Sequence, residues 1–171
     1  MMKMKYTALI IAISQIILCA NLCAQSSAKE GCRLTMVIPE HFVSAESQDD
    51  VISYRSKRGR TTLSMSKYNK DAQKSYSNAQ SAADQTYKGL KEKGIAIEMN
   101  VVSEDVGKTS FTIVSWVIPS LKKGFEPHMV AFNDECDILY RFTMTSSTSN
   151  KKELDKAFRS FLRTCKRSKS K

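Results

Sequence analysis

Residues 110–118 would form a strand with apolar side chains on both of its faces. Apolar side chains fall on both faces, with Phe111, Ile113 and Val117 on one and Val114, Trp116 and Ile118 on the other. A strand of this kind is covered on both sides and lies centrally in its sheet. The fold therefore requires a sheet with further structure packed against both faces.

The pattern on either side of this strand predicts the order of the other elements. The apolar residues of the first helix recur at steps of three and four, and Gly94 follows as its C-terminal cap. Asn150 and Glu153 make a capping box for the closing helix. We expect strands at 33–38, 51–56, 61–67, 95–102, 128–132 and 136–145, and a first helix at 72–93. The order βββ-α-ββββ-α predicts an α/β (α+β) fold with a seven-strand, mostly antiparallel sheet and two packed helices.

This order resembles the Mog1/PsbP-like α/β sandwich, a family that includes DUF1795-type proteins. The resemblance spans about residues 33–165 and is carried by LTMVIPEHF (34–42), VISYRSKRGRTTLSMSKY (51–68) and FTIVSWVIP (111–119). It is a resemblance of pattern, and no functional residue of such proteins matches a residue of this chain. It implies the fold, together with an expectation that the protein binds other proteins and catalyses nothing.

The first 24 residues have the layout of a secretory signal peptide. A basic start with Lys3 and Lys5 precedes an apolar run, and small or polar residues follow it. We expect cleavage after Ala24 or Ala28, one α/β domain at 25–165, and a periplasmic or secreted location.

Two other interpretations of this segment stay open. A membrane anchor needs about 20 apolar residues, whereas the run here is shorter and is interrupted by Ser14 and Gln15. A lipoprotein anchor would use Cys19 or Cys23, but neither follows the small residue that usually precedes a lipidated cysteine.

The charge of the chain constrains its partners. The chain has 27 Lys and Arg against 17 Asp and Glu, and removal of Lys3 and Lys5 with the signal leaves a net charge of +8. In an exported protein this charge favours an acidic protein partner or an anionic envelope surface over nucleic acid. A solvated, lysine-rich surface is the alternative. The final residues, 166–171, are basic, and we expect them to form a disordered tail.

Three cysteines follow the predicted signal, namely Cys32, Cys136 and Cys165. Export favours disulfides, and an odd number leaves one thiol free or paired between chains. The closing helix runs back along the last strand, which brings Cys165 near Cys136 and predicts that pair. The competing pair is Cys32–Cys165, which joins the two termini.

No residue pattern points to catalysis, a cofactor or a metal. His41 and His128 are the only histidines, and no serine sits in a nucleophile elbow that a catalytic triad could use. The sequence has no CxxC spacing, calcium loop or phosphate-cradling glycine loop. We therefore expect a non-enzymatic protein with no cofactor and no metal site. A cryptic envelope hydrolase with an unrecognised acid pair is the alternative.

Two surface segments combine features that favour binding. Arginine at an exposed hairpin tip forks onto carboxylates, and aromatic residues on loops are enriched at interfaces. A solvated tip, and an aromatic ring that packs into the core, are the plainer interpretations. The candidate residues are Lys57, Arg58 and Arg60 in the first hairpin turn, and Lys122, Lys123 and Phe125 in the loop after the central strand.

These expectations combine into one hypothesis, an exported, non-enzymatic binding or adaptor protein. Its most specific form is an immunity or inhibitor protein that neutralises an envelope toxin or hydrolase. A small-molecule or lipid carrier is a further alternative, and it requires a deep apolar cavity between the helix at 72–93 and the sheet. The sequence leaves the partner and the oligomeric state open.

Overall fold

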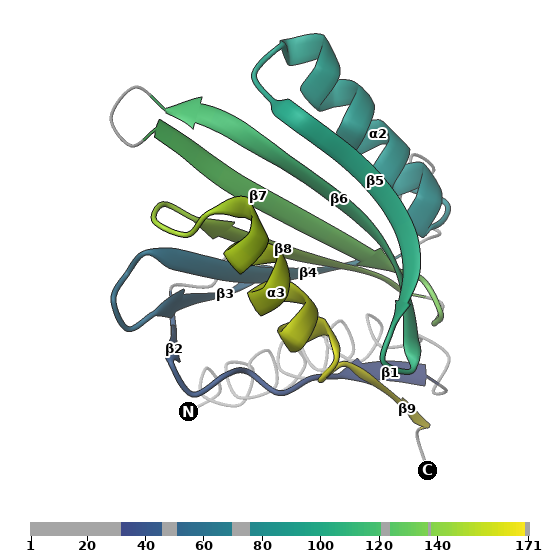
Figure 1. Ribbon diagram of the computed structural model, residues 1–171. Coiled ribbons are helices and arrows are strands. Elements are labelled where there is room, and N and C mark those ends of the chain that lie inside the picture. Colours follow the sequence, from purple (N-terminus) through teal and green to yellow (C-terminus); the bar gives the residue numbers. More distant parts are fainter. Residues whose placement is uncertain (1–31, 46–50, 70–75, 121–123, 137, 170–171) are drawn as a thin grey trace, which may run out of the picture. The chain divides into compact units, whose positions relative to one another are not determined.

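The strand that is apolar on both faces is β6 (Thr109–Ser120) in the computed structural model, and it lies inside the sheet (Figure 1). It pairs with β5 (Ile97–Val106) on one side and with β7 (Gly124–Asn133) on the other. Phe111 and Val114, on opposite faces of this strand, are 2% and 0% exposed. The strand is thus covered on both sides, as its alternation predicts.

The structure describes residues 32–45, 51–69, 76–120, 124–136 and 138–169. The predicted signal peptide at 1–24 lies outside the described residues, so its cleavage and the expected export stay predictions. No helix in the described part of the chain is long and apolar enough to cross a membrane.

Seven strands form one sheet in the order β2-β3-β4-β8-β7-β6-β5, and every neighbouring pair is antiparallel. Its other members are β2 (Phe42–Ser44), β3 (Val51–Ser56), β4 (Thr61–Asn69) and β8 (Ile138–Ser146). Short turns join β3 to β4 and β7 to β8, and such turns set adjacent strands antiparallel. The predicted seven-strand antiparallel sheet is confirmed.

Both helices begin at an asparagine cap. At the start of α3 (Lys151–Leu162), the Oδ1 atom of Asn150 accepts a hydrogen bond from the Glu153 N–H over 2.9 Å. The Glu153 carboxylate in turn accepts from the Asn150 N–H, which completes the predicted capping box. Asn78 caps α2 (Ala79–Lys93) in the same way. The helix therefore begins at Ala79, later than the sequence pattern predicts.

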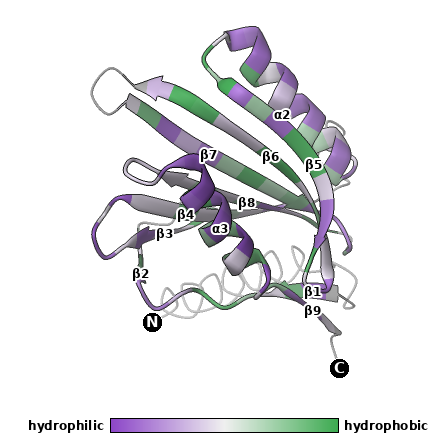
Figure 2. Cartoon of the chain, in the orientation of Figure 1, coloured by the Kyte–Doolittle hydropathy of each residue, from purple (hydrophilic) through white to green (hydrophobic). Residues whose placement is uncertain are grey.

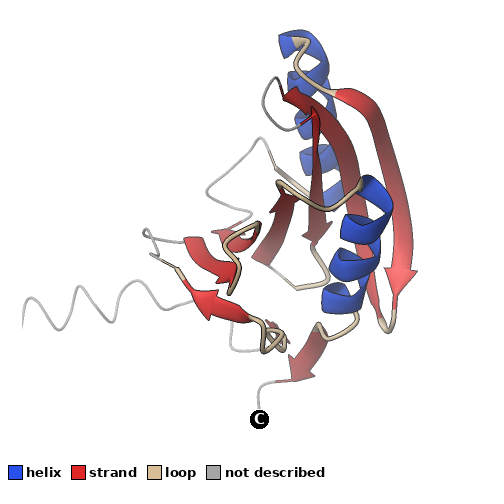
Figure 3. Ribbon diagram, turned by 60° about the vertical axis from the view of Figure 1, so that its left-hand side comes forward, coloured by secondary structure: helices blue, strands red, loops and turns tan. Residues whose placement is uncertain are grey.

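The two helices cover opposite faces of the sheet (Figure 3). α2 packs against Val114 and Val130, and α3 packs on the other face, which carries Ile113 and Met129. In Figure 2, apolar residues are concentrated on the strands, whereas both helices are largely polar on the side in view. The layers therefore bury both faces of the central strands, and the fold is the expected α/β sandwich.

The first predicted strand, 33–38, does not join the seven-stranded sheet. Its start forms β1 (Cys32–Thr35), which pairs with β9 (Lys166–Lys169) in a separate two-stranded sheet. The prediction of a disordered basic tail is therefore wrong as far as Lys169. Main-chain groups make this ladder, so a polar segment without apolar alternation can form it. The seventh strand is instead β2, which follows the turn at Pro39.

Candidate anion-binding pocket

The turn between β3 and β4 holds the predicted basic residues in a defined shape. Gly59 has φ +67°, a left-handed conformation that favours glycine, and its N–H donates to the Ser56 carbonyl over 2.6 Å. The Ser56 Oγ accepts from the N–H of Arg60 over 3.2 Å and from that of Thr61 over 3.1 Å. The Ser56 hydroxyl thus fixes the backbone of the turn, and the basic side chains extend from this fixed backbone.

A second segment, just after Pro39, lies against this hairpin. The Phe42 N–H donates to the Pro39 carbonyl over 2.9 Å, so the chain turns here. Phe42 is buried, and its ring centroid lies 4.7 Å from that of His41. The N–H of Lys57 donates to the His41 carbonyl over 2.8 Å. These contacts fix the backbone of His41 beside the basic turn.

The turn between β8 and α3 supplies a third segment. The Ser147 N–H donates to the Arg60 carbonyl over 3.0 Å, and the Thr61 hydroxyl donates to the Ser146 Oγ over 3.3 Å. The same Ser146 oxygen accepts from the Thr148 N–H over 3.3 Å. Thr148 is therefore held next to the end of the hairpin.

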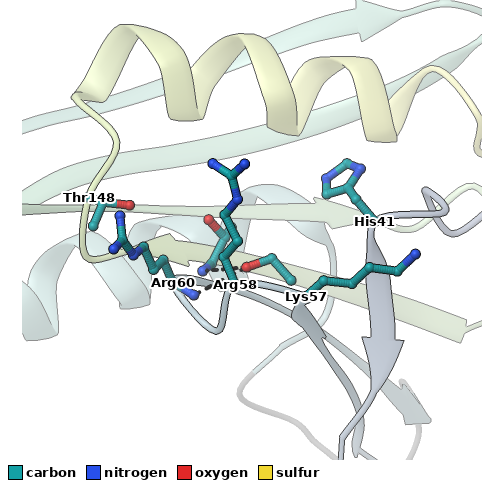
Figure 4. Close-up of a pocket in the computed structure, with 7 residues that line it drawn as sticks. His41, Lys57, Arg58, Arg60 and Thr148 are labelled. Atoms are coloured by element: carbon teal, nitrogen blue, oxygen red, sulfur yellow. Dashed lines mark hydrogen bonds between the residues drawn. The ribbon is translucent and has the colours of Figure 1, made fainter.

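These three segments line a pocket of about 470 Å³, here called the hairpin pocket. Figure 4 shows Arg60 beside Thr148, and Arg58 and His41 pointing to the same side. The backbone contacts above explain why residues far apart in the sequence meet here. The pocket is lined by His41, Ser56, Lys57, Arg58, Arg60, Thr61 and Thr148.

The hairpin pocket has an unbalanced positive charge. Three of its lining residues, Lys57, Arg58 and Arg60, are cations, and none is an acid. Within the described part of the chain, none of these three side chains forms an ion pair. Like charges that converge without a counter-charge raise the local potential and attract anions. The arrangement can therefore bind an anionic group without first breaking an internal salt bridge.

The second predicted segment is not part of the hairpin pocket. Lys122 and Lys123 lie outside the described residues. Phe125 pairs with Pro119 near the start of β7 and is 64% exposed. The alternative interpretation, in which this ring packs into the core, is therefore wrong, and the ring is exposed. Phe125 lies at the same end of the sheet as the hairpin, with β8 between them.

The cysteine predictions need correction. Cys165 is a free thiol, 1% exposed, and burial raises its pKa to about 12. The predicted Cys136–Cys165 pair is therefore wrong, and so is the competing Cys32–Cys165 pair. Cys136 and Cys165 both belong to one core cluster of buried residues. Cys136 is disulfide-bonded, and the other half of that bond lies outside the described side chains.

The two histidines occupy unrelated environments. His41 lines the hairpin pocket, whereas His128 stacks on Trp116 within the sheet, with ring centroids 5.3 Å apart and planes 8° apart. Burial lowers the pKa of His128, and the charge of Glu126 opposes this shift in part. Among the described residues, no group of three His, Cys, Asp or Glu side chains is placed to hold a metal ion.

Solved structures identify the fold, although no family model and no curated protein sequence matches the chain. The Ran-binding protein Mog1p of Saccharomyces cerevisiae aligns at a TM-score of 0.51 and 13% identity, over 78% of this chain and 89% of that one. Cyanobacterial PsbP (CyanoP) from Synechocystis aligns at 0.52 and 8% identity, over 82% and 95%. The fold is Mog1/PsbP-like. A Bacteroides thetaiotaomicron protein aligns at 0.52 and 12% identity, but this chain spans only 44% of it.

Within this Mog1/PsbP-like fold, the sequence predicted three of the seven residues that line the hairpin pocket. Lys57, Arg58 and Arg60 were predicted from their position in a turn, whereas His41 and Thr148 were given no role in binding. The missing link is a set of main-chain hydrogen bonds between distant segments. Such bonds depend on the tertiary path of the chain. Because they join main-chain groups, the residue types in the sequence do not predict them.

Proposed function

We propose that the chain is an exported, non-enzymatic binding or adaptor protein that engages an anionic partner through the hairpin pocket. The carrying observation is the convergence of Lys57, Arg58 and Arg60 on one pocket with no acidic residue in its lining. Arginine forks and a lysine ammonium are donor-only groups that suit carboxylate or phosphate oxygens. The partner is accordingly an acidic protein or an anionic envelope surface.

The lining of the hairpin pocket suits binding better than hydrolysis. A hydrolase of the kind considered above needs an acid pair, or a nucleophile activated by a base. Ser56 is the one serine in the lining, and its Oγ already accepts two main-chain N–H groups. Those bonds draw electron density from the oxygen and give it a structural role in the turn.

An immunity or inhibitor protein is the specific form of this proposal. Arginine side chains on a rigid hairpin can enter a partner's acidic active site and pair with its carboxylates. The carrier alternative has less support, because the pocket beneath α2, lined by Tyr68, Tyr76 and Phe132 among others, holds only about 10 Å³. That volume has room for about one water molecule.

Affinity capture of the mature protein from the envelope fraction tests the proposal. We expect a stoichiometric partner that is lost when Lys57, Arg58 and Arg60 are all changed to Gln. The matched control changes Lys88, Lys91 and Lys93 to Gln, because these exposed lysines of α2 carry the same charge away from the hairpin. Equal loss of capture in both variants, or capture that survives in both, would overturn a role for the pocket.

A further inference from the structure

We propose that the hairpin pocket takes a phosphate-type oxyanion carried on a small molecule or a lipid headgroup. This inference rests on the proposed function, because it keeps an anionic partner at the same pocket. It differs from the immunity form of that function in naming a phosphate group, and not the carboxylates of an acidic protein, as the group that is bound. It concerns the side chains of Lys57, Arg58 and Arg60 together with the hydroxyl of Thr148.

The charge of the pocket matches a multiply charged anion. Three cations line it with no acid to balance them, and one carboxylate supplies a single negative charge. A phosphate monoester carries about −1.5 to −2 at pH 7 and offers three strong acceptor oxygens. It therefore neutralises more of this charge at one point than a partner's single Asp or Glu can.

The donors that line the pocket come from three segments of the chain. Arg58 and Arg60 come from the hairpin turn, His41 from the segment after Pro39, and Thr148 from the turn before α3. A carboxylate is planar and is satisfied by one arginine fork. Donors that converge from three chain segments suit the tetrahedral oxygens of a phosphate better.

The size of the pocket indicates what carries the phosphate. A volume of about 470 Å³ falls within the roughly 300–1,000 Å³ of small-molecule sites. The free ion would leave most of that space to water. The pocket therefore has room for the organic group that carries the phosphate, whether that group is free in solution or at the surface of a lipid bilayer.

The backbone of the site is already organised for binding. The Lys57 N–H to His41 carbonyl bond of 2.8 Å and the Ser147 N–H to Arg60 carbonyl bond of 3.0 Å tie the three segments together. Binding must then order mainly the long side chains, which reduces its entropic cost. None of these bonds uses a side chain of Lys57, Arg58 or Arg60, so those residues can be changed without breaking the frame.

Titration calorimetry of the mature protein, with amide chemical shifts read in parallel, tests the inference. The probes are pyrophosphate, glycerol 3-phosphate, hexaglutamate, and vesicles of phosphatidylglycerol or phosphatidylcholine. We expect a phosphate probe to bind one to one and to shift amides of residues 57–61 and 148. Changing Arg58 and Arg60 to Gln should weaken binding by about tenfold or more, the usual result of losing a charge-assisted hydrogen bond.

Two variants keep the test specific. Changing Lys88 and Lys91 of α2 to Gln removes the same charge and should leave affinity within about twofold, because these exposed lysines do not line the pocket and salt screens exposed charges. Changing Arg58 and Arg60 to Lys retains charge but loses the forks, and it should weaken phosphate binding less than Gln does. Equal losses in the Arg-to-Gln and α2 variants would overturn the assignment.

The outcomes separate this inference from the function on which it rests. Binding of hexaglutamate, with no binding of any phosphate probe, overturns the phosphate assignment and leaves an acidic protein partner in place. No binding by any of the anionic probes overturns both. Binding of glycerol 3-phosphate without the vesicles assigns a soluble ligand, and binding of phosphatidylglycerol but not phosphatidylcholine vesicles assigns a lipid headgroup.

Discussion

The N–H of Lys57 donates to the carbonyl oxygen of His41 over 2.8 Å. This bond joins the end of β3 to the segment after Pro39, so a histidine and a basic hairpin that are distant in the sequence line one pocket. Because the bond is between main-chain groups, it survives replacement of either side chain. The pocket can therefore be dissected one side chain at a time.

Changing Ser56 to Ala should loosen the hairpin turn while leaving all its charges in place. The Ser56 Oγ accepts from the N–H groups of Arg60 and Thr61, and the variant leaves both donors to water. We expect the free energy of unfolding to fall by about 1 kcal/mol, the typical contribution of such a bond. Urea denaturation measures this loss, and unchanged stability would contradict the role given to the hydroxyl.

The Cys165 thiol should be inert in the folded protein. It is 1% exposed and its pKa is raised from 9.0 to about 12, so at pH 8 it lacks both access and the reactive thiolate form. We expect iodoacetamide to modify it only when the chain unfolds. Rapid native modification would contradict the buried position.

The raised pKa of Cys165 also predicts how stability depends on pH. Because the folded pKa lies above the unfolded one, this group's contribution to stability is complete below pH 9 and is lost as the pH rises toward 12.

The bond to Cys136 should be made by Cys32. Cys165 is free, and Cys19 and Cys23 lie in the segment that we expect to be cleaved. The main chain of β1, which begins at Cys32, already contacts β8, the strand that follows Cys136. The contact is a hydrogen bond of 3.2 Å from the Leu34 N–H to the Tyr140 Oη. Non-reducing peptide mapping of the exported protein should show this pair.

Reduction of the same bond gives an independent measurement. We expect it to lower the free energy of unfolding by about 2–4 kcal/mol, the typical contribution of a disulfide. A bond from Cys136 to Cys19 or Cys23 would show that the N-terminal segment is retained, and it would contradict the predicted signal cleavage.

The fold was largely predictable because its strongest determinants are local. Apolar alternation located the doubly covered β6, and the Asn150–Glu153 capping box located the start of α3. Both signals act within a few residues, where side-chain type and backbone conformation are directly coupled. The Mog1/PsbP-like resemblance, which rests on the order of such elements, was confirmed for the same reason.

What the sequence did not predict depends on contacts between distant main-chain segments. Leu34 pairs with Arg167 in the β1–β9 ladder, yet the tail has no apolar alternation. The disulfide prediction failed for a related reason. Strand and helix lengths place Cys165 and Cys136 in one region, and both lie in the same core cluster, but lengths do not fix the side-chain directions that a disulfide requires.

His128 should make the protein less stable as the pH falls below 6.5, the ordinary pKa of histidine. Its Nε2 atom is buried without a hydrogen-bond partner among the described residues, and burial holds its pKa below the ordinary 6.5. The unfolded chain therefore takes up a proton near pH 6.5, before the folded chain does. By linkage, the stabilising contribution is complete above the unfolded pKa of 6.5, and it is lost as the pH falls from that value through the lower folded pKa. Changing His128 to Phe keeps a ring against Trp116 and removes the titration, so thermal unfolding of this variant should depend less on pH. An identical pH dependence in both proteins would show that other groups cause the loss.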